Sequence, residues 1–453
     1  MLVALIVGTL RMAAKPISDP DSWWHLRVGE LLWSGEITLR RTGPLSSFAT
    51  EPWTPRDWIP QLVASALERS FGLPGVAWLF GVGLVAFIVT AYLVARRQAD
   101  PLPAALVTGL GFLGAAGSLS PRPQIVSFVL LLVFVGAWLQ SAQDLRPRWW
   151  LIPMTWVWAS SHGMWYLGVA IGILSVIGIV LDRRLAIRRV GRLFLVPALS
   201  LVAAAVTPPG PTLLLAVVQT GDKWEFVTEW APPNFLSLTP AASMLMVALV
   251  ALIWARRGTR LSWHHLLLLL LATAMVLMSG RTVAAGAAIL IPLLAMTLQQ
   301  VLYDRPPHRL VPQETQSLWA ASALAVATLA LLVPRTSAVA GSVPNDLNNE
   351  LASLPQGSAL LNDYALGGWL HWRHPDLDTV IDGFTDGYTV EAIEEYISAV
   401  GAGPGWDEYV DETGARYALL QEESPLAYAL TQQLSWVEVG EDEGYVLLRH
   451  PSR

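Results

Sequence analysis

The stretch from Asp19 to Arg27 gathers side chains that could do chemistry, in the order Asp19-Pro20-Asp21-Ser22-Trp23-Trp24-His25-Leu26-Arg27. Its two carboxylates and its imidazole can accept protons or ligate a metal, and its guanidinium can hold an anion. The stretch follows the first apolar segment, at the point where the chain would leave a membrane. We interpret it as the floor of an active site.

The elements that must position these side chains are membrane helices. Of 453 residues, 53% are hydrophobic and only 14% are charged, and the mean hydropathy is +0.47. A soluble domain of this size would have about a quarter charged residues. The chain has no cysteine, which excludes disulfides, thiolate metal sites and a cysteine nucleophile and makes redox chemistry unexpected.

Eleven apolar runs are long enough to form membrane helices, or nearly so. They fall at about 1 to 14, 74 to 95, 103 to 119, 125 to 140, 149 to 161, 164 to 181, 193 to 208, 240 to 255, 263 to 279, 283 to 302 and 317 to 334. The first run is too short to cross alone at about 1.5 Å per residue, so either its helix continues past Lys15 or the chain starts upstream.

Arginines in alternate short loops predict the orientation by the positive-inside rule, with the N-terminus in the cytoplasm. The loops at residues 15 to 73, 118 to 124, 161 to 162, 208 to 239 and 279 to 281 are then outside, together with the tail. Residues 1 to 340 hold 25 Lys and Arg against 15 Asp and Glu, whereas residues 341 to 453 hold 4 against 20. We therefore predict a membrane domain over 1 to 340 and an acidic outer domain over 341 to 453, which is not expected to bind nucleic acid.

The first outer loop and the tail have their own predicted structure. Tryptophan and arginine are dense in the loop, which suits helices that lie on the bilayer surface. The tail reads as a small α/β domain. Strands are predicted at Ser358 to Asn362, Gly368 to Trp372, Thr379 to Asp382 and Tyr417 to Gln421, helices at Val390 to Val400 and Pro425 to Gln433, and a hairpin of Trp436 to Val439 with Tyr445 to Leu448 around Glu443-Gly444.

The first loop resembles that of the GT-C glycosyltransferase superfamily, in its protein mannosyltransferase and aminoarabinose transferase branch, which includes a broad group of bacterial multi-pass proteins. The matching residues are Asp19 to Leu26 with Gly29, Gly35-Glu36-Ile37, Pro44-Leu45-Ser46 and Trp53 to Trp58. Later pieces continue the resemblance in order: Arg122-Pro123-Gln124, Trp158 to Gly163, Pro209-Gly210, Glu229-Trp230, Arg281, Gly367-Gly368-Trp369-Leu370 and Ile381-Asp382-Gly383. Two positions depart from the pattern, because Gly43 stands where an Asp is expected and Phe384 where the tail motif usually has Arg.

The resemblance implies a mainly α membrane protein of the bacterial plasma membrane, a polytopic GT-C-like bundle of about eleven transmembrane helices with an extracytoplasmic α/β domain at its C-terminus. It also implies transfer of a sugar from a polyprenyl-phosphate donor in the membrane lipid to a glycan, lipid or protein acceptor on the outer face. The acceptor hydroxyl must lose a proton, and the leaving phosphate must be held by cations. We assign the base to Asp21, which directly precedes the indole pair, with Asp19 as a second catalytic carboxylate.

The other expected site residues follow from the same resemblance. The donor phosphate would be bound by Arg27, Arg56, Arg122, Arg281, His25 and His162. The acceptor or sugar would be bound by Trp23, Trp24, Asp57, Glu229 and Asp382. The histidines and carboxylates on one face leave room for a divalent cation such as Mg²⁺, Mn²⁺ or Ca²⁺, but their spacing assigns no ligand set.

Simpler interpretations of the first-loop residues remain open. Asp19 can cap a helix that begins near Ser22. Trp23 and Trp24 can be anchors at the membrane interface. His25 can be a structural hydrogen-bonding group.

The later residues also have simpler interpretations. Arg281 can snorkel to the interface, and Glu229 can pair with Lys223. Asp382 and Asp386, near Tyr388, can close over the site or can simply be solvated.

Two functional classes therefore remain: a membrane glycosyltransferase, and a non-catalytic GT-C-like protein that binds a lipid-linked glycan or a partner in envelope assembly. A transporter is disfavoured, because the polar residues cluster at one face of the membrane and not in broken helices at its middle.

Overall fold

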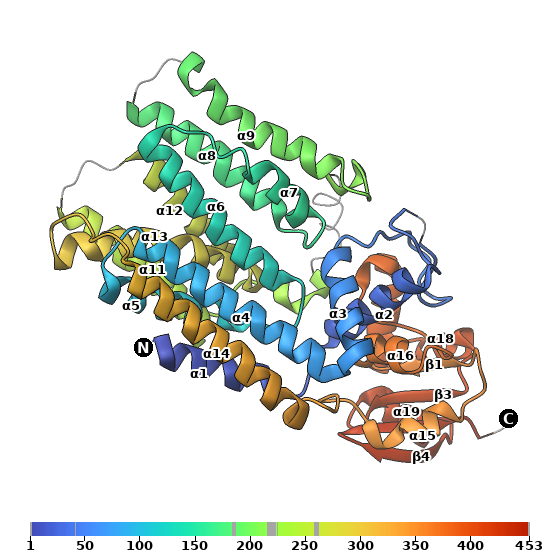
Figure 1. The fold of residues 1–453 in the computed structure, drawn as a ribbon. Helices are drawn as coiled ribbons and strands as arrows, with labels where there is room; N and C mark the ends of the chain where they lie inside the picture. Colours follow the sequence, from blue (N-terminus) through green and yellow to red (C-terminus); the bar gives the residue numbers. More distant parts are fainter. Residues whose placement is uncertain are drawn as a thin grey trace. The chain divides into compact units, whose positions relative to one another are not determined.

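The computed structural model describes residues 2–40, 42–183, 187–214, 223, 225–257 and 262–451. Within this described part, contacts divide the chain into two compact units. Unit 1 is drawn from Met1–Lys15, Ala77–Gln219 and Val227–Arg335, and unit 2 from Pro16–Val76, Thr220–Phe226 and Thr336–Arg453. Figure 1 colours both along the sequence.

Unit 1 is a helical bundle. Its elements in chain order are α1 (Leu2–Ala13), α4 (Leu73–Arg96), α5 (Pro101–Ala115), η1 (Ala116–Ser118), α6 (Gln124–Asp144), α7 (Leu151–Ala159), α8 (Trp165–Arg183), α9 (Ile187–Ala205), η3 (Thr228–Trp230), α11 (Leu238–Arg257), α12 (Trp263–Met278), η4 (Gly280–Thr282), α13 (Val283–Leu302) and α14 (Pro312–Thr336). Each of the eleven predicted apolar runs is helical, and α1 ends at Ala13, so it does not continue past Lys15.

Seven described helices are long and apolar enough to cross a membrane. They are α4, α5 with η1, α6, α8, α11, η4 with α13, and α14. Two further apolar helical stretches are shorter: Val190–Ala205 within α9, and Trp263–Met278, which is α12. Helix α7 has nine residues and reaches only about 14 Å, too short to cross the bilayer alone. The chain is a multi-pass membrane protein.

Helix α13 is the centre of unit 1. It packs against α5, α6, α11 and α12. Of the most apolar 18-residue stretch of Gly280–Leu302, 89% is buried. Small residues permit this, because a Cβ on Gly286 would lie 2.8 Å from the Ala272 carbonyl oxygen, and one on Gly111 would lie 2.4 Å from Ile291. Close helix approach through such residues is a usual means of packing in membranes.

The two ends of the bundle carry different loops. At one end Arg96 of α4 binds Glu314 of α14 at 2.8 Å, and Arg305 binds Asp100 at 2.6 Å. The other end carries Arg122, two residues before α6. The 18 residues of α5 with η1, Pro101–Ser118, run between these two loops and span about 27 Å. The orientation of these ends in the membrane stays a prediction.

Unit 2 combines two helices of the first loop with the C-terminal domain. Its elements are α2 (Pro20–Ser34), α3 (Trp58–Phe71), η5 (Asn345–Leu347), α15 (Asn348–Ala352), β1 (Ala359–Asn362), η6 (Tyr364–Leu366), α16 (Gly367–Arg373), β2 (Asp378–Thr379), η7 (Thr385–Gly387), α17 (Val390–Val400), α18 (Trp406–Thr413), β3 (Tyr417–Gln421), α19 (Pro425–Gln433), β4 (Val437–Asp442) and β5 (Tyr445–Arg449). The described strands form one sheet in the order β2-β1-β3-β5-β4.

The sheet is mixed: β1 runs parallel to β2 and β3, while β5 runs antiparallel to β3 and β4. The predicted hairpin turn is confirmed, with positive φ at Glu443 (51°) and Gly444 (77°). That backbone suits a two-residue turn whose twist matches the strands.

One predicted strand is wrong, because Gly368 to Trp372 lies in helix α16. The glycines explain it: a Cβ on Gly368 would lie 2.9 Å from the Pro20 carbonyl oxygen, and one on Gly367 would lie 2.3 Å from the Ile381 carbonyl oxygen. The Gly-Gly pair therefore serves close packing of α16 between α2 and the chain after β2.

Candidate functional site

The stretch from Asp19 to Arg27 forms the start of α2. Asp19 is the N-cap, and its side chain accepts a hydrogen bond from the Asp21 N–H at 3.0 Å, which confirms the capping interpretation. Asp21 lies in the first turn, where the helix dipole favours a carboxylate. A Cβ built on Gly383 would lie 3.2 Å from Asp21 Oδ1, so this carboxylate borders the chain that follows β2.

The aromatic residues of this stretch are packed inside unit 2. Trp23 is 1% exposed and stacks on Trp372, with ring centroids 5.2 Å apart. The Trp24 ring lies 4.7 Å from that of Phe384. The Gln61 amide lies 3.0 Å from Nδ1 of His25, which is buried. Trp23 is thus a core residue and not an interface anchor.

Residues 382 to 388, which we call the Asp382 loop, are fixed from within by Asp382. This side chain is 1% exposed. Its Oδ2 lies 2.7 Å from His371 Nε2, and its Oδ1 accepts the Phe384 N–H at 2.7 Å. Burial, and then the nearby Asp382 carboxylate, raise the pKa of Tyr388 well above its usual value.

Other side chains hold the Asp382 loop from outside. Arg56 binds Asp386 at 3.1 Å. Lys223 Nζ donates to the carbonyl oxygens of Thr385 at 2.9 Å and Tyr388 at 2.5 Å. The proposed pairing of Lys223 with Glu229 is therefore wrong.

The remaining expected residues of unit 2 are placed as follows. Arg27 forms an ion pair with Glu30 at 3.3 Å, both about a quarter exposed. Asp57 occupies the N-cap position of α3, although its side chain makes no capping hydrogen bond.

Unit 1 brings together Arg122, Glu229 and Arg281. Arg122 Nη1 lies 2.8 Å from Glu229 Oε1, and the Gly280 N–H donates to the Ala231 carbonyl oxygen at 3.0 Å. The Arg281 guanidinium lies 5.7 Å from the Trp230 ring centroid. Among the described residues, no ion pair or hydrogen bond engages the Arg281 side chain.

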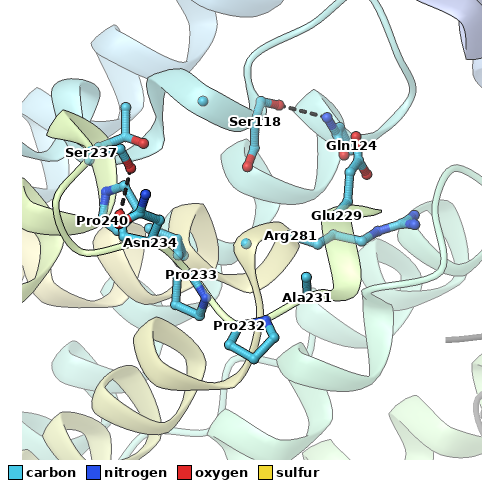
Figure 2. Close-up of a pocket in the computed structure, with 15 residues that line it drawn as sticks. Ser118, Gln124, Glu229, Ala231, Pro232, Pro233, Asn234, Ser237, Pro240 and Arg281 are labelled. Carbon is cyan, nitrogen blue, oxygen red and sulfur yellow. Dashed lines mark hydrogen bonds between the residues drawn. The ribbon is translucent and has the colours of Figure 1, made fainter. Parts of the chain in front are cut away.

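Glu229 and Arg281, but not Arg122, line a pocket of about 290 Å³ (Figure 2). Arg281, Glu229 and Gln124 contribute polar side chains, and Pro232 and Pro233 contribute apolar surface. The Gln124 amide is turned to the Ser118 carbonyl oxygen, at 2.6 Å. The described lining holds one carboxylate, Glu229, and one cation, Arg281. Glu229 is paired with Arg122, which lies outside the lining, so Arg281 is the charge of the lining that an anionic ligand can engage.

His162 lies in the turn between α7 and α8 and is 5% exposed. Its Nδ1 lies 2.8 Å from Ser127 Oγ. Burial, together with the smaller effects of the Arg281 and Arg122 charges, lowers the pKa of His162 to about 3. The ring is therefore neutral at physiological pH.

The described residues do not fit a divalent cation held by the protein. Within the parts of the chain that the structure describes, no three His, Asp or Glu side chains converge on one point. We therefore derive no step through a metal.

Comparison with known proteins rests on structure, because no protein-family model and no curated protein matches the sequence. ArnT from Cupriavidus metallidurans bound to undecaprenyl phosphate aligns with a TM-score of 0.56 at 16% identity, over 99% of this chain and 97% of that chain. The oligosaccharyltransferase of Archaeoglobus fulgidus tethered to an acceptor peptide with the NVT sequon aligns with a TM-score of 0.57 at 13% identity, over 92% of this chain and 69% of that chain.

The chain has the GT-C fold. A further structure of the archaeal oligosaccharyltransferase AglB, in complex with an inhibitory peptide and a dolichol-phosphate, aligns at 11% identity with a TM-score of 0.55, over 99% of this chain and 74% of that chain. At such identities the likeness establishes the GT-C fold alone, so the reaction must be argued from this chain's residues.

Several residues that shape these sites escaped the sequence analysis. His371 follows the Gly367-Gly368-Trp369-Leu370 motif by one position, so the motif could have pointed to it. Ser127 has no comparable signal, because its partner lies 35 residues away in the chain. Lys223 was considered only as a partner of Glu229, because its actual partners lie more than 160 residues away.

Proposed function

We propose that this GT-C protein is an inverting glycosyltransferase of a bacterial plasma membrane. It moves a sugar from a polyprenyl-phosphate donor to an envelope glycan, lipid or protein acceptor on the outer face, where the C-terminal domain also lies. The observation that carries the proposal is the pocket of unit 1, in which Arg281 has no anionic partner among the described residues. The GT-C fold, seen elsewhere with undecaprenyl phosphate and dolichol-phosphate, supports it.

In unit 1, Arg281 and Arg122 bind the phosphate of the donor, with His162 as a further donor group. Guanidinium groups suit this task because they bind phosphate oxygens through charge-assisted hydrogen bonds. As the bond between the anomeric carbon and the phosphate oxygen breaks, negative charge grows on the phosphate, and fixed cations stabilise it.

In unit 2, Asp21 accepts the proton of the acceptor hydroxyl as its oxygen bonds to the anomeric carbon. The products are the glycosylated acceptor and polyprenyl phosphate, with inversion at the anomeric carbon after one displacement. Asp19 holds the start of α2 as its N-cap, so Asp21 is the carboxylate of this stretch to which we assign proton transfer.

The alternative is a GT-C protein that binds a lipid-linked glycan without turning it over. One observation favours it: Phe384 stands where the family pattern usually has Arg. Its ring packs against Trp24 at 4.7 Å and Trp53 at 5.1 Å, so an apolar contact occupies a place where a cation is expected.

Activity of the purified chain in nanodiscs distinguishes the two functions. The purified chain is incubated with each of a panel of radiolabelled undecaprenyl-phosphate sugars as donors and with a membrane extract as the source of acceptors. Sugar transfer and the binding of undecaprenyl phosphate are both measured. Asp21→Asn should abolish transfer and leave undecaprenyl phosphate binding intact. The exposed Asp407, on α18, gives the control Asp407→Asn, which should match the wild type.

Binding without transfer by the wild type, for every donor in the panel, would establish the alternative. Wild-type transfer that survives in Asp21→Asn would remove Asp21 as the base. The absence of undecaprenyl phosphate binding would contradict both functions.

A further inference from the structure

Three buried side chains of unit 1 form a hydrogen-bonded chain that ends at His162. The Trp158 indole N–H, at the end of α7, donates to Ser127 Oγ at 2.7 Å. Ser127, in the first turn of α6, lies 2.8 Å from His162 Nδ1. Trp158 is fully buried and Ser127 is 1% exposed, so neither hydrogen bond competes with bulk water.

The groups that can only donate determine the direction of these hydrogen bonds. An indole nitrogen only donates, so Ser127 Oγ accepts from Trp158, and its own hydroxyl proton remains for another acceptor. The Met164 backbone N–H also points to Nδ1, at 3.4 Å, and it too can only donate. Because the Met164 N–H cannot accept, this contact is favourable only when Nδ1 carries no proton, and the Ser127 hydroxyl then donates to Nδ1 as well.

A neutral ring with a bare Nδ1 carries its proton on Nε2. Burial and the positive charges of Arg281 and Arg122 keep the His162 ring neutral by lowering its pKa to about 3. Within the described chain Nε2 has no hydrogen-bond partner, yet it is not one of the fully buried unpartnered atoms. Nε2 therefore retains a small solvent-accessible surface, although His162 as a whole is only 5% exposed.

We propose that Ser127 and Trp158 are positioning residues that fix His162 as a neutral Nε2–H donor to a phosphate oxygen of the ligand. The inference rests on the proposed function, because it assigns the phosphate of the polyprenyl donor to this group. A neutral donor suits a site with two arginines, since it adds a hydrogen bond without adding a third positive charge. If the Ser127 contacts served packing alone, losing them would change stability but not the tautomer or phosphate binding.

The first measurement is the tautomer of His162 in the full-length chain. The chain has eight histidines, so selective ¹⁵N-histidine labelling in nanodiscs gives a sparse spectrum, and loss of one signal set in His162→Gln assigns the ring. We expect a bare Nδ1 and a protonated Nε2 in the wild type, a mixture of tautomers in Ser127→Ala, and a return to the wild-type pattern in Ser127→Thr.

The second measurement is ligand binding. Undecaprenyl phosphate should bind roughly tenfold more weakly to both Ser127→Ala and His162→Gln, the loss of one hydrogen bond to a charged group. Ser175, in α8, offers a matched control, because its Oγ lies 3.0 Å from Nε2 of another buried histidine, His264. Ser175→Ala should alter the His264 signals and leave undecaprenyl phosphate affinity unchanged. Inorganic phosphate, tested as competitor, shows whether the free ion or the lipid headgroup is preferred.

A proton on Nδ1 of wild-type His162, or wild-type affinity in Ser127→Ala and His162→Gln, would overturn the inference. If both variants weaken binding but no donor sugar is ever transferred, the inference stands as a binding device and the transferase function fails. If transfer depends on Asp21 while the tautomer is unchanged in Ser127→Ala, the transferase function stands and the inference fails.

Discussion

Gly383→Ala tests whether Asp21 does chemistry by adding one methyl group beside it. The new Cβ would lie 3.2 Å from Asp21 Oδ1, and apart from Gly383 itself and its two neighbours in sequence no other atom of the described chain lies within 4 Å of it. Gly383 does not have a positive φ, so alanine fits its backbone without strain. The substitution therefore perturbs the carboxylate more directly than it perturbs the fold.

The expected magnitude follows from that distance. A contact of 3.2 Å is tighter than ordinary van der Waals separation, so the carboxylate must move by a few tenths of an ångström. A misplacement of about 1 Å can cost about 100-fold in rate, so a shift of this size should lower kcat roughly three- to tenfold. That fall corresponds to about 1 kcal/mol in the barrier. Undecaprenyl phosphate affinity should not change, because the residues that we propose to bind the phosphate, Arg281, Arg122 and His162, belong to unit 1.

The assay is sugar transfer at saturating donor, with two glycine controls. In Gly387→Ala the new Cβ would lie 3.3 Å from Ala49 Cβ. This variant crowds the Asp382 loop to a similar degree, but the new methyl group does not contact Asp21. In Gly401→Ala, at the end of α17, all contacts would be ordinary at 3.5 Å. Wild-type kcat in Gly383→Ala, or an equal fall in Gly387→Ala, would refute the reasoning that Asp21 is the sensitive group.

Three further outcomes are expected. Arg281→Ala should weaken undecaprenyl phosphate binding by roughly tenfold to a hundredfold, as the loss of a charge-assisted hydrogen bond implies, and equal affinity measured by titration in nanodiscs would contradict the pocket's role. His371→Ala should lower the stability of unit 2 by about 3 kcal/mol, because it leaves Oδ2 of the buried Asp382 without its His371 partner. Arg56→Ala removes an ion pair whose side chains are 29% and 27% exposed, and should cost about 1 kcal/mol or less. Chemical unfolding followed by tryptophan fluorescence checks this order, and equal losses would contradict it. The chain has no cysteine, so a membrane-impermeant maleimide should label Glu423→Cys but not Arg309→Cys in intact cells, and the reverse pattern would invert the orientation.

Local sequence signals determined much of the fold. The apolar runs are all helical, because a run of that length must satisfy its backbone internally in lipid. Helices α17 and α19 and strand β3 begin and end where the pattern predicts, since caps and alternation act within one or two turns. The cap at Asp19 is of the same kind, because its partner, the Asp21 N–H, is two residues away.

The partners of the polar side chains were decided by the tertiary structure. Glu229 pairs with Arg122, 107 residues earlier, and Lys223 binds the Asp382 loop more than 160 residues later. The sequence pattern predicts a strand that begins at Gly368, whereas in the structure Gly368 belongs to helix α16 and packs closely against Pro20 of α2. Sequence spacing gave the types and the ends of the helices on which the candidate residues lie. Helix packing decides which of these residues are in contact, and which ring nitrogen of His162 carries the proton. Hydrogen bonds act only over about 3 Å, whereas the partners are tens to hundreds of residues apart in the sequence.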